Sequence, residues 1–288
     1  MIIFMQLLAL APLWLLLSLT SIKNVSATSL PSKYRIVALT SLSADLISNI
    51  SPEMLVGIPS SSLLRNDPYY SRLTTVSVGR NQPSIEKIIQ LRPDFVVGAN
   101  GFHDKTLKKL ESMGLSTFSY SVDNFFSLQA FADQLSKLTS SPKLSIENRI
   151  QQCFLYHDHF RDKGNVLVLT GLKPLIAPTA NSWSGSLLQH LSINNLSSKL
   201  PPSGQFKGYA TLSSEWLVTN KPDSIVLVSF PGIDKVDLSM HPLLGNLPAV
   251  KSKKVYYLDY YGLINPGSLA SIDNTCQKLN AINSSPAS

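Results

Sequence analysis

Tyrosine and arginine side chains gather in the segments that we expect to follow the ends of strands. The chain has 10 tyrosines, and these segments contain Tyr69, Tyr70, Tyr209, Tyr260 and Tyr261. They also contain Arg65, Arg80 and Lys207. A tyrosine offers an aromatic face for stacking and a phenol for hydrogen bonding, and an arginine grips carboxylates or catecholates with a planar fork. Together these side chains predict a binding site for a large anionic metal chelate.

Residues suited to catalysis or metal binding are few. The sequence has no Gly-x-Gly-x-x-Gly or Gly-Lys-Ser/Thr phosphate loop and no Gly-x-Ser-x-Gly elbow. His157 and His159 are two residues apart on an expected helix, so they point about 200° apart and cannot share one ion. The weak candidates for a metal ligand or a catalytic base are His103, Asp104 and Asp259. We therefore expect no enzyme, no resident metal and no intrinsic cofactor.

The composition is that of a globular protein. Of the 288 residues, 44% are apolar and 15% are charged, which excludes a disordered chain and allows one or two domains. Lys and Arg number 25 against 18 Asp and Glu, and the resulting net charge of +7 mildly favours anionic ligands. The basic residues form no continuous stripe, so nucleic-acid binding is disfavoured.

The first 27 residues read as a targeting segment. Residues 2 to 20 are apolar except for Gln6, Ser18 and Thr20, and Val25-Ser26-Ala27 ends with the small residues that signal peptidase accepts. We expect a secretory signal cleaved after Ala27 and therefore an exported, periplasmic protein. An uncleaved membrane anchor stays an alternative, because no Lys or Arg precedes the apolar run.

One structural unit occurs twice. Ser84-Ile85-Glu86 leads to Pro93-Asp94, and Ser213-Ser214-Glu215 leads to Pro222-Asp223, with seven residues from Glu to Pro in each case (93 − 86 and 222 − 215). The two glutamates are 129 residues apart (215 − 86). Each unit predicts a short helix opened by Ser, with Glu in its first turn, followed by a buried strand. Such helix-to-strand units build α/β layers.

Strands and helices alternate on both sides of a helical middle segment. Short apolar runs predict strands at residues 34–40, 55–58, 95–97, 116–120, 165–170, 224–226 and 254–259. We expect an α/β fold of two Rossmann-like lobes, residues 28–122 and 163–288, with mostly parallel sheets and a ligand cleft between them. Residues 123–162 are expected to form a single linking helix, interrupted at Ser140-Ser141-Pro142. The loops expected to face the cleft follow the strand ends, at residues 40–42, 59–72, 79–83, 98–104, 171–185, 205–211, 230–235 and 259–266.

The order of these segments resembles the substrate-binding proteins of bacterial ABC importers that serve ferric siderophores, cobalamin and haem. The resemblance covers Lys33 to about Ile282, and the residues that carry it are Ser43-Ala44-Asp45, Val78-Gly79, Pro93-Asp94, Glu111 to Leu115, Ser213-Ser214-Glu215, Pro222-Asp223, His241-Pro242-Leu243 and Pro248-Ala249-Val250. It implies two lobes joined by one rigid helix, with little movement between them. It also implies a monomeric receptor that captures a chelate and delivers it to a permease.

The resemblance assigns roles to several residues. The family's permease-docking glutamates match Glu86 and Glu215, although a glutamate in the first turn also stabilises a helix by itself. Ligand-contacting aromatic residues of the family match Tyr209, Tyr260 and Tyr261. We expect a ferric siderophore as cargo, with cobalamin or haem as the alternative and a secreted two-lobe enzyme acting on a metal complex as a distant one.

Two departures from the family pattern affect these expectations. A cobalamin-binding member has a tryptophan in the loop that matches Ala99-Asn100-Gly101, where this chain has no aromatic residue, and this weakens the case for a corrinoid. The same member pairs a cysteine matching Cys276 with one near Leu191, where this chain has none. The other cysteine of the present chain, Cys153, lies in the expected linking helix. A bridge between Cys153 and Cys276 would need Cα atoms within ~7 Å, which the sequence does not assure, so we expect two buried thiols.

Overall fold

The computed structural model describes residues 34–77, 82–155, 164–203 and 207–284. Four expectations lie outside the described residues: the signal sequence with its cleavage after Ala27, the candidate ligand residue Arg80, and the histidines His157 and His159. Within the described ranges, no helix has both the length and the apolar character that a membrane crossing requires.

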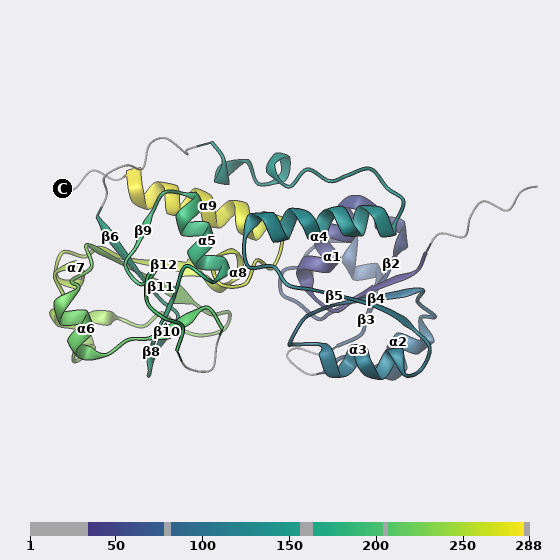
Figure 1. Cartoon of the computed structure of the whole chain (residues 1–288), viewed down its shortest axis with the longest axis horizontal. Helices are drawn as coiled ribbons and strands as arrows, with labels where there is room; N and C mark the ends of the chain where they lie inside the picture. The colour runs from purple at the N-terminus through teal and green to yellow at the C-terminus, as the bar shows by residue number, and fades with distance from the viewer. Residues whose placement is uncertain (1–33, 78–81, 156–163, 204–206, 285–288) are drawn as a thin grey trace, which may run out of the picture. The chain divides into compact units, whose positions relative to one another are not determined.

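The first lobe is built on a five-stranded parallel sheet with strand order β3-β2-β1-β4-β5 (Figure 1). Its strands are β1 (Ile36–Ala38), β2 (Leu55–Ile58), β3 (Thr74–Thr75), β4 (Phe95–Ala99) and β5 (Ser116–Tyr120). Its helices are α1 (Ser41–Ile50), α2 (Ile85–Gln90), α3 (Asp104–Glu111) and the linking helix α4 (Phe125–Leu138). Side chains in β1 alternate between two apolar clusters, which shows that both faces of the sheet are covered.

The second lobe contains a four-stranded parallel sheet with order β12-β11-β6-β9. Its strands are β6 (Asn165–Leu169), β9 (Asn194–Asn195), β11 (Ser224–Ser229) and β12 (Val255–Asp259). Its helices are α5 (Trp183–His190), α6 (Ser214–Thr219), α7 (Pro248–Lys251), α8 (Tyr260–Leu263) and α9 (Leu269–Ser284). The expected α/β class with two mostly parallel sheets is confirmed.

A second, antiparallel sheet in this lobe replaces two of the expected loops. Its order is β10-β8-β7, formed by β7 (Gly171–Leu172), β8 (Leu175–Pro178) and β10 (Tyr209–Thr211). The expectation of loops was therefore wrong for residues 171–172, 175–178 and 209–211, which are strands, and for residues 183–185, which begin α5; residues 205 and 206 lie outside the described residues. Strands of two to four residues are too short to show the alternation of polar and apolar side chains by which strands are recognised.

The linking segment is helical over its first part. Helix α4 begins after the N-cap Asn124, whose side chain accepts a hydrogen bond from Ser127 N, and ends at Leu138. Beyond Pro142 the chain forms two 3₁₀ turns, Glu147–Arg149 and Gln151–Cys153, where we expected a continuation of the helix. Cys153 therefore lies in a segment that runs beside α9.

The repeat found in the sequence forms the same hydrogen bonds in both lobes. Asp94 Oδ2 accepts a hydrogen bond from Arg35 N at 2.7 Å, and Asp223 Oδ2 accepts one from Asn165 N at 2.6 Å. The backbone N–H groups of the same two aspartates donate to Arg35 O and Asn165 O. In both lobes this aspartate holds the start of the lobe's first strand against the strand that follows the short helix.

One apolar cluster is shared by the two sheets. It contains Ile36 and Ala38 of β1 together with Val166 and Val168 of β6, and residues of α4, α5 and α9 complete it. A polar contact joins the same parts of the chain, since Asp45 Oδ2 in α1 accepts a hydrogen bond from Leu269 N, the first residue of α9, at 2.8 Å. The lobes are thus packed on a common core as well as connected by α4.

Candidate ligand-binding site

Three aromatic side chains follow the carboxyl ends of two neighbouring strands in the second lobe. Phe230 comes directly after β11, and Tyr260 and Tyr261 come directly after β12. The rings of Phe230 and Tyr260 stack with their centroids 5.2 Å apart, and those of Tyr260 and Tyr261 meet edge to face at 5.2 Å. All three side chains are half-buried. Ligands of open α/β sheets bind at this edge, so the cluster is a candidate binding surface.

Tyr209 belongs to the same group of residues. It lies at the start of β10, and its phenol is close enough to Tyr260 for the two to interact electrostatically. Burial raises the pKa of Tyr209 to about 12, although a hydrogen bond with Ser184 opposes the rise. Near neutral pH the phenol therefore keeps its proton and can donate a hydrogen bond to a ligand oxygen. Sequence analysis expected residues 230–235 to face the cleft, because they follow a buried strand, but did not select Phe230 as a ligand contact.

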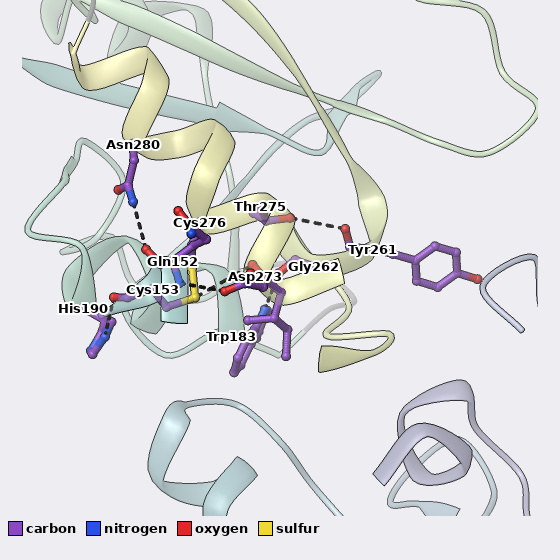
Figure 2. The surroundings of a disulfide bond; sticks show 11 residues. Gln152, Cys153, Trp183, His190, Tyr261, Gly262, Asp273, Thr275, Cys276 and Asn280 are labelled. Carbon is purple, nitrogen blue, oxygen red and sulfur yellow. Dashed lines mark hydrogen bonds between the residues drawn. A yellow bond between two sulfur atoms is a disulfide. The ribbon is translucent and has the colours of Figure 1, made fainter. Parts of the chain in front are cut away.

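A tight turn positions Tyr260 and Tyr261. Trp183 Nε1 donates to Gly262 O at 2.7 Å and Thr275 Oγ1 donates to Tyr261 O at 3.5 Å (Figure 2). The Ser184 hydroxyl donates to Leu263 O. Gly262 has a φ of +90°, and a Cβ atom built on it would lie 2.1 Å from Ser271 O in α9. Only glycine fits there, because both the backbone conformation and the close approach of α9 exclude a side chain.

We expect Gly262→Ala to destabilise the protein by about 2–4 kcal/mol, since it adds a backbone collision to the cost of a positive φ. The matched control is Gly232→Ala in the loop after β11. Gly232 has a φ of +76°, but a Cβ there would meet nothing within 4 Å. Urea unfolding of both variants separates the two effects. Equal losses of stability would show that the contact with α9 is unimportant.

Tyr69 and Tyr70 of the first lobe make no ring contact with the aromatic cluster, although Tyr261 lies beside Gly267, next to Leu63 of the first lobe. Tyr69 and Tyr70 line a cavity of about 400 Å³ together with residues of α1 and the first residues of α9, and the tyrosines of the second lobe do not line it. Their phenols have partners within the first lobe, because Tyr70 Oη bonds Ser48 Oγ at 2.7 Å and Tyr69 Oη donates to Pro52 O at 2.5 Å. Arg65 is exposed. The structure thus brings together Tyr209, Tyr260 and Tyr261 but not the candidates of the first lobe.

The two cysteines form a disulfide, so our expectation of two thiols was wrong. Cys153 and Cys276 are both fully buried, and their Cα atoms are 5.0 Å apart. Gln152 N donates to Asp273 Oδ1 at 2.8 Å and Asn280 Nδ2 donates to Gln152 O at 2.9 Å, which holds the segment along α9 (Figure 2). The error came from expecting Cys153 in the second part of the linking helix, where the chain instead forms a 3₁₀ turn beside α9.

The bridged segment also contacts α5, because Cys153 O is 3.1 Å from His190 Nε2 at the end of that helix. The bridge anchors α9, whose first turns support the residues of the Tyr261–Leu263 turn.

The two candidate docking glutamates have equivalent positions in the repeat. Glu86 lies in the first turn of α2, which Ser84 caps, and Glu215 lies in the first turn of α6, which Ser213 caps. Both side chains are exposed. Hydrogen bonds from its own backbone N–H and from the hydroxyls of Ser213 and Ser214 lower the pKa of Glu215. The structure therefore presents one exposed carboxylate on each lobe, at matching places in the repeat.

The weak candidates for catalysis and metal binding have structural partners. His103 is 3% exposed, and its Nδ1 accepts a hydrogen bond from Ala99 N at 3.1 Å. Burial lowers the pKa of His103, which keeps the ring neutral. Asp104 Oδ1 accepts from Gly101 N, and Asp259 pairs with Lys278 at 2.7 Å. Over the part of the chain that the structure describes, no three His, Cys, Asp or Glu side chains are grouped to hold a metal ion.

Comparison of the sequence with known protein families agrees with this fold. The family model of periplasmic binding proteins matches residues 36–153 and 157–261. The chain therefore belongs to the periplasmic binding protein family, and the resemblance noted in the sequence is confirmed. Among curated proteins, none matches the sequence significantly.

Solved structures show the same fold at low sequence identity. An ABC transporter substrate-binding protein from Listeria monocytogenes EGD-e is 19% identical with a TM-score of 0.72, and the match covers 88% of this chain and 99% of that one. A possible iron-binding periplasmic solute-binding protein from Staphylococcus epidermidis is 16% identical with a TM-score of 0.69, covering 88% and 100%. The periplasmic haem-binding protein HutB of Vibrio cholerae is 21% identical with a TM-score of 0.71, covering 88% and 100%.

Proposed function

We propose that this protein is the exported, monomeric substrate-binding protein of an ABC importer and that its cargo is a ferric siderophore. The family and the fold support the class. The observation that carries the cargo is the cluster of Phe230, Tyr260 and Tyr261 beside the protonated phenol of Tyr209. Aromatic faces stack on the flat groups of a chelate, and a phenol donates to its catecholate or hydroxamate oxygens.

Haem is the second candidate cargo, favoured by the similarity to HutB. A tyrosine that ligates haem iron must lose its proton, and burial raises the pKa of Tyr209 to about 12. Tyr209 therefore suits hydrogen bonding to a siderophore better than direct ligation of iron. Cobalamin stays the third candidate, and the absence of an aromatic residue at Ala99-Asn100-Gly101 weighs against it.

The test is a titration of residues 28–288 with ferric siderophores, haem and cobalamin in parallel, followed by quenching of tryptophan and tyrosine fluorescence. Saturable, stoichiometric quenching by a ferric siderophore is the expected result. Saturation by haem or cobalamin alone would show that this molecule is the cargo instead of a siderophore. The protein would still be the substrate-binding protein of an ABC importer. Binding of none of them would favour an unrelated chelate or a secreted enzyme that acts on a metal complex.

The aromatic cluster should account for much of the affinity. We expect Tyr260→Ala and Tyr261→Ala each to weaken cargo binding about 10-fold or more, because burying an aromatic side chain against a ligand is worth about 1.5–3 kcal/mol. Tyr34→Ala is the matched control, since Tyr34 is 44% exposed and precedes β1, at the amino end of the first sheet. Unchanged affinity in both cluster variants would place the cargo elsewhere.

A further inference from the structure

The cavity lined by Tyr69 and Tyr70 has no counterpart in the function proposed so far. It measures about 400 Å³ and lies where α1, the segment before β3 and the start of α9 meet. None of the four aromatic residues of the second-lobe cluster lines it. The side chains that give it its chemical character are Asp45, Asn49, Asp67, Tyr69, Tyr70 and Ser268.

The wall of this cavity carries two carboxylates and no basic residue. Each carboxylate has one oxygen bonded to a backbone N–H: Asp45 Oδ2 accepts from Leu269 N and Asp67 Oδ1 from Tyr69 N, both at 2.8 Å. The ion pairs among the described residues are Lys143–Asp133 and Lys278–Asp259, so neither carboxylate belongs to one. Arg149, which is exposed, acts on Asp45 only from beyond ion-pair distance.

The negative charge of the two carboxylates extends into the cavity. Burial raises the pKa of Tyr70, and the charges of Asp45 and Asp67 raise it further. Burial likewise raises the pKa of Asp45; the hydrogen bond from Leu269 N and the charge of Arg149 oppose this rise, and the charge of Asp67 adds to it more weakly. The two carboxylates therefore repel each other, and a cation bound beside them would relieve this repulsion.

The aromatic walls suit the same kind of ligand. The rings of Tyr69 and Tyr70 meet edge to face with centroids 5.0 Å apart. Because both phenols already have partners, on Pro52 and Ser48, the tyrosines offer the cavity mainly their rings. An aromatic face attracts an ammonium or guanidinium group, and its carbon atoms pack against an alkyl chain.

We propose that this cavity is a second binding site that takes a small organic cation, an alkylammonium or alkylguanidinium ion. Asp45 and Asp67 hold the charged group, and Tyr69 and Tyr70 hold the alkyl body. The ligand would contact α1 in the first lobe and Ser268 at the start of α9, and Asp45 and Leu269 are already joined there across 224 residues of chain. A cation bound at this place would therefore strengthen the junction between the lobes without occupying the cargo site.

The test uses three small molecules of one shape and different charge: n-butylammonium, 1-butanol and butyrate, at constant ionic strength. In a ¹⁵N-resolved NMR titration of the cargo-free protein, butylammonium should cause saturable shifts at the amides of residues 45–49, 67–70 and 268–270. Butanol should bind at least about fivefold more weakly, since a charge pair of this kind is worth at least about that factor. Butyrate should not saturate.

Two variants and one control test whether Asp45 and Asp67 bind the cation. Asp67→Asn and Asp45→Asn should each weaken butylammonium binding about fivefold, and either asparagine keeps an oxygen for the backbone hydrogen bond. Asp234→Asn, an exposed position in the loop after β11, should leave it unchanged. If Asp45→Asn does not fold, Asp67→Asn decides alone. Equal binding of butanol and butylammonium, unchanged affinity in Asp67→Asn, or shifts elsewhere in the protein would each overturn the proposal.

Discussion

Replacing Cys153 and Cys276 together with alanine is expected to lower the free energy of unfolding by about 3–5 kcal/mol. The bridge joins residues 123 positions apart, and closing a loop of that length removes much of the entropy of the unfolded chain. It also ties the 3₁₀ turn at Cys153 to α9. Thr275 in α9 donates a hydrogen bond to Tyr261 O and so supports the Tyr261–Leu263 turn. A loss of this size is a large share of the stability of a typical domain.

Urea unfolding with and without a reductant separates the disulfide from the side chains. In the wild type, the reductant should move the midpoint to that of the double alanine variant, and in the variant it should change nothing. The oxidised wild type, denatured and titrated for thiols, should show none, because its two cysteines are bonded to each other. Two free thiols in protein recovered from an oxidising compartment would contradict the bridge.

Reversing the charge of both docking glutamates, Glu86→Arg with Glu215→Arg, should reduce transport to background and leave cargo affinity unchanged. Truncating one partner of a desolvated charge pair costs about 2–5 kcal/mol, and a reversal adds repulsion to that cost. The exposed carboxylates have equivalent positions in the two halves of the repeat, as a symmetric permease dimer would require. Each single reversal should give an intermediate rate.

The assay is uptake of the cargo in the native host with its own copy of the gene removed, together with fluorescence titration of each purified variant. The matched control reverses two other exposed carboxylates, Glu111 and Glu147, and changes the net charge by the same amount. Transport by that control should stay near the wild-type rate. A loss of cargo affinity in the Glu86 and Glu215 variant would refute the docking role.

Much of the fold could be predicted from the sequence, because short local patterns indicate its strands and helix starts. The strands at residues 55–58 and 116–120 were predicted with the bounds that the structure shows, since each is a short run between turn or helix-end residues. The repeat was readable from Glu86 and Glu215, because the same cap, glutamate and proline recur in both halves. The antiparallel strands β7 and β10 were not, because two or three residues contain no period.

The candidate site could be predicted only in part, because its residues come together through tertiary contacts. Tyr260 and Tyr261 were expected beside Tyr209, and the structure places the three near one another. The phenols of Tyr69 and Tyr70 are instead hydrogen-bonded within the first lobe, Tyr70 with Ser48 in α1 and Tyr69 with Pro52 O just after α1. No local pattern indicates that contact, nor the pairing of Cys153 with Cys276, which depends on where the chain runs after α4.

The core cluster that passes from β1 to β6 has a consequence for how the molecule can be divided. Each half of the repeat has its own sheet, but the apolar side chains of α4, α5 and α9 that cover both sheets belong to one continuous interior. A half produced alone would expose that interior to water. The two halves are therefore duplicated in architecture but share one interior, and we expect that neither half folds by itself.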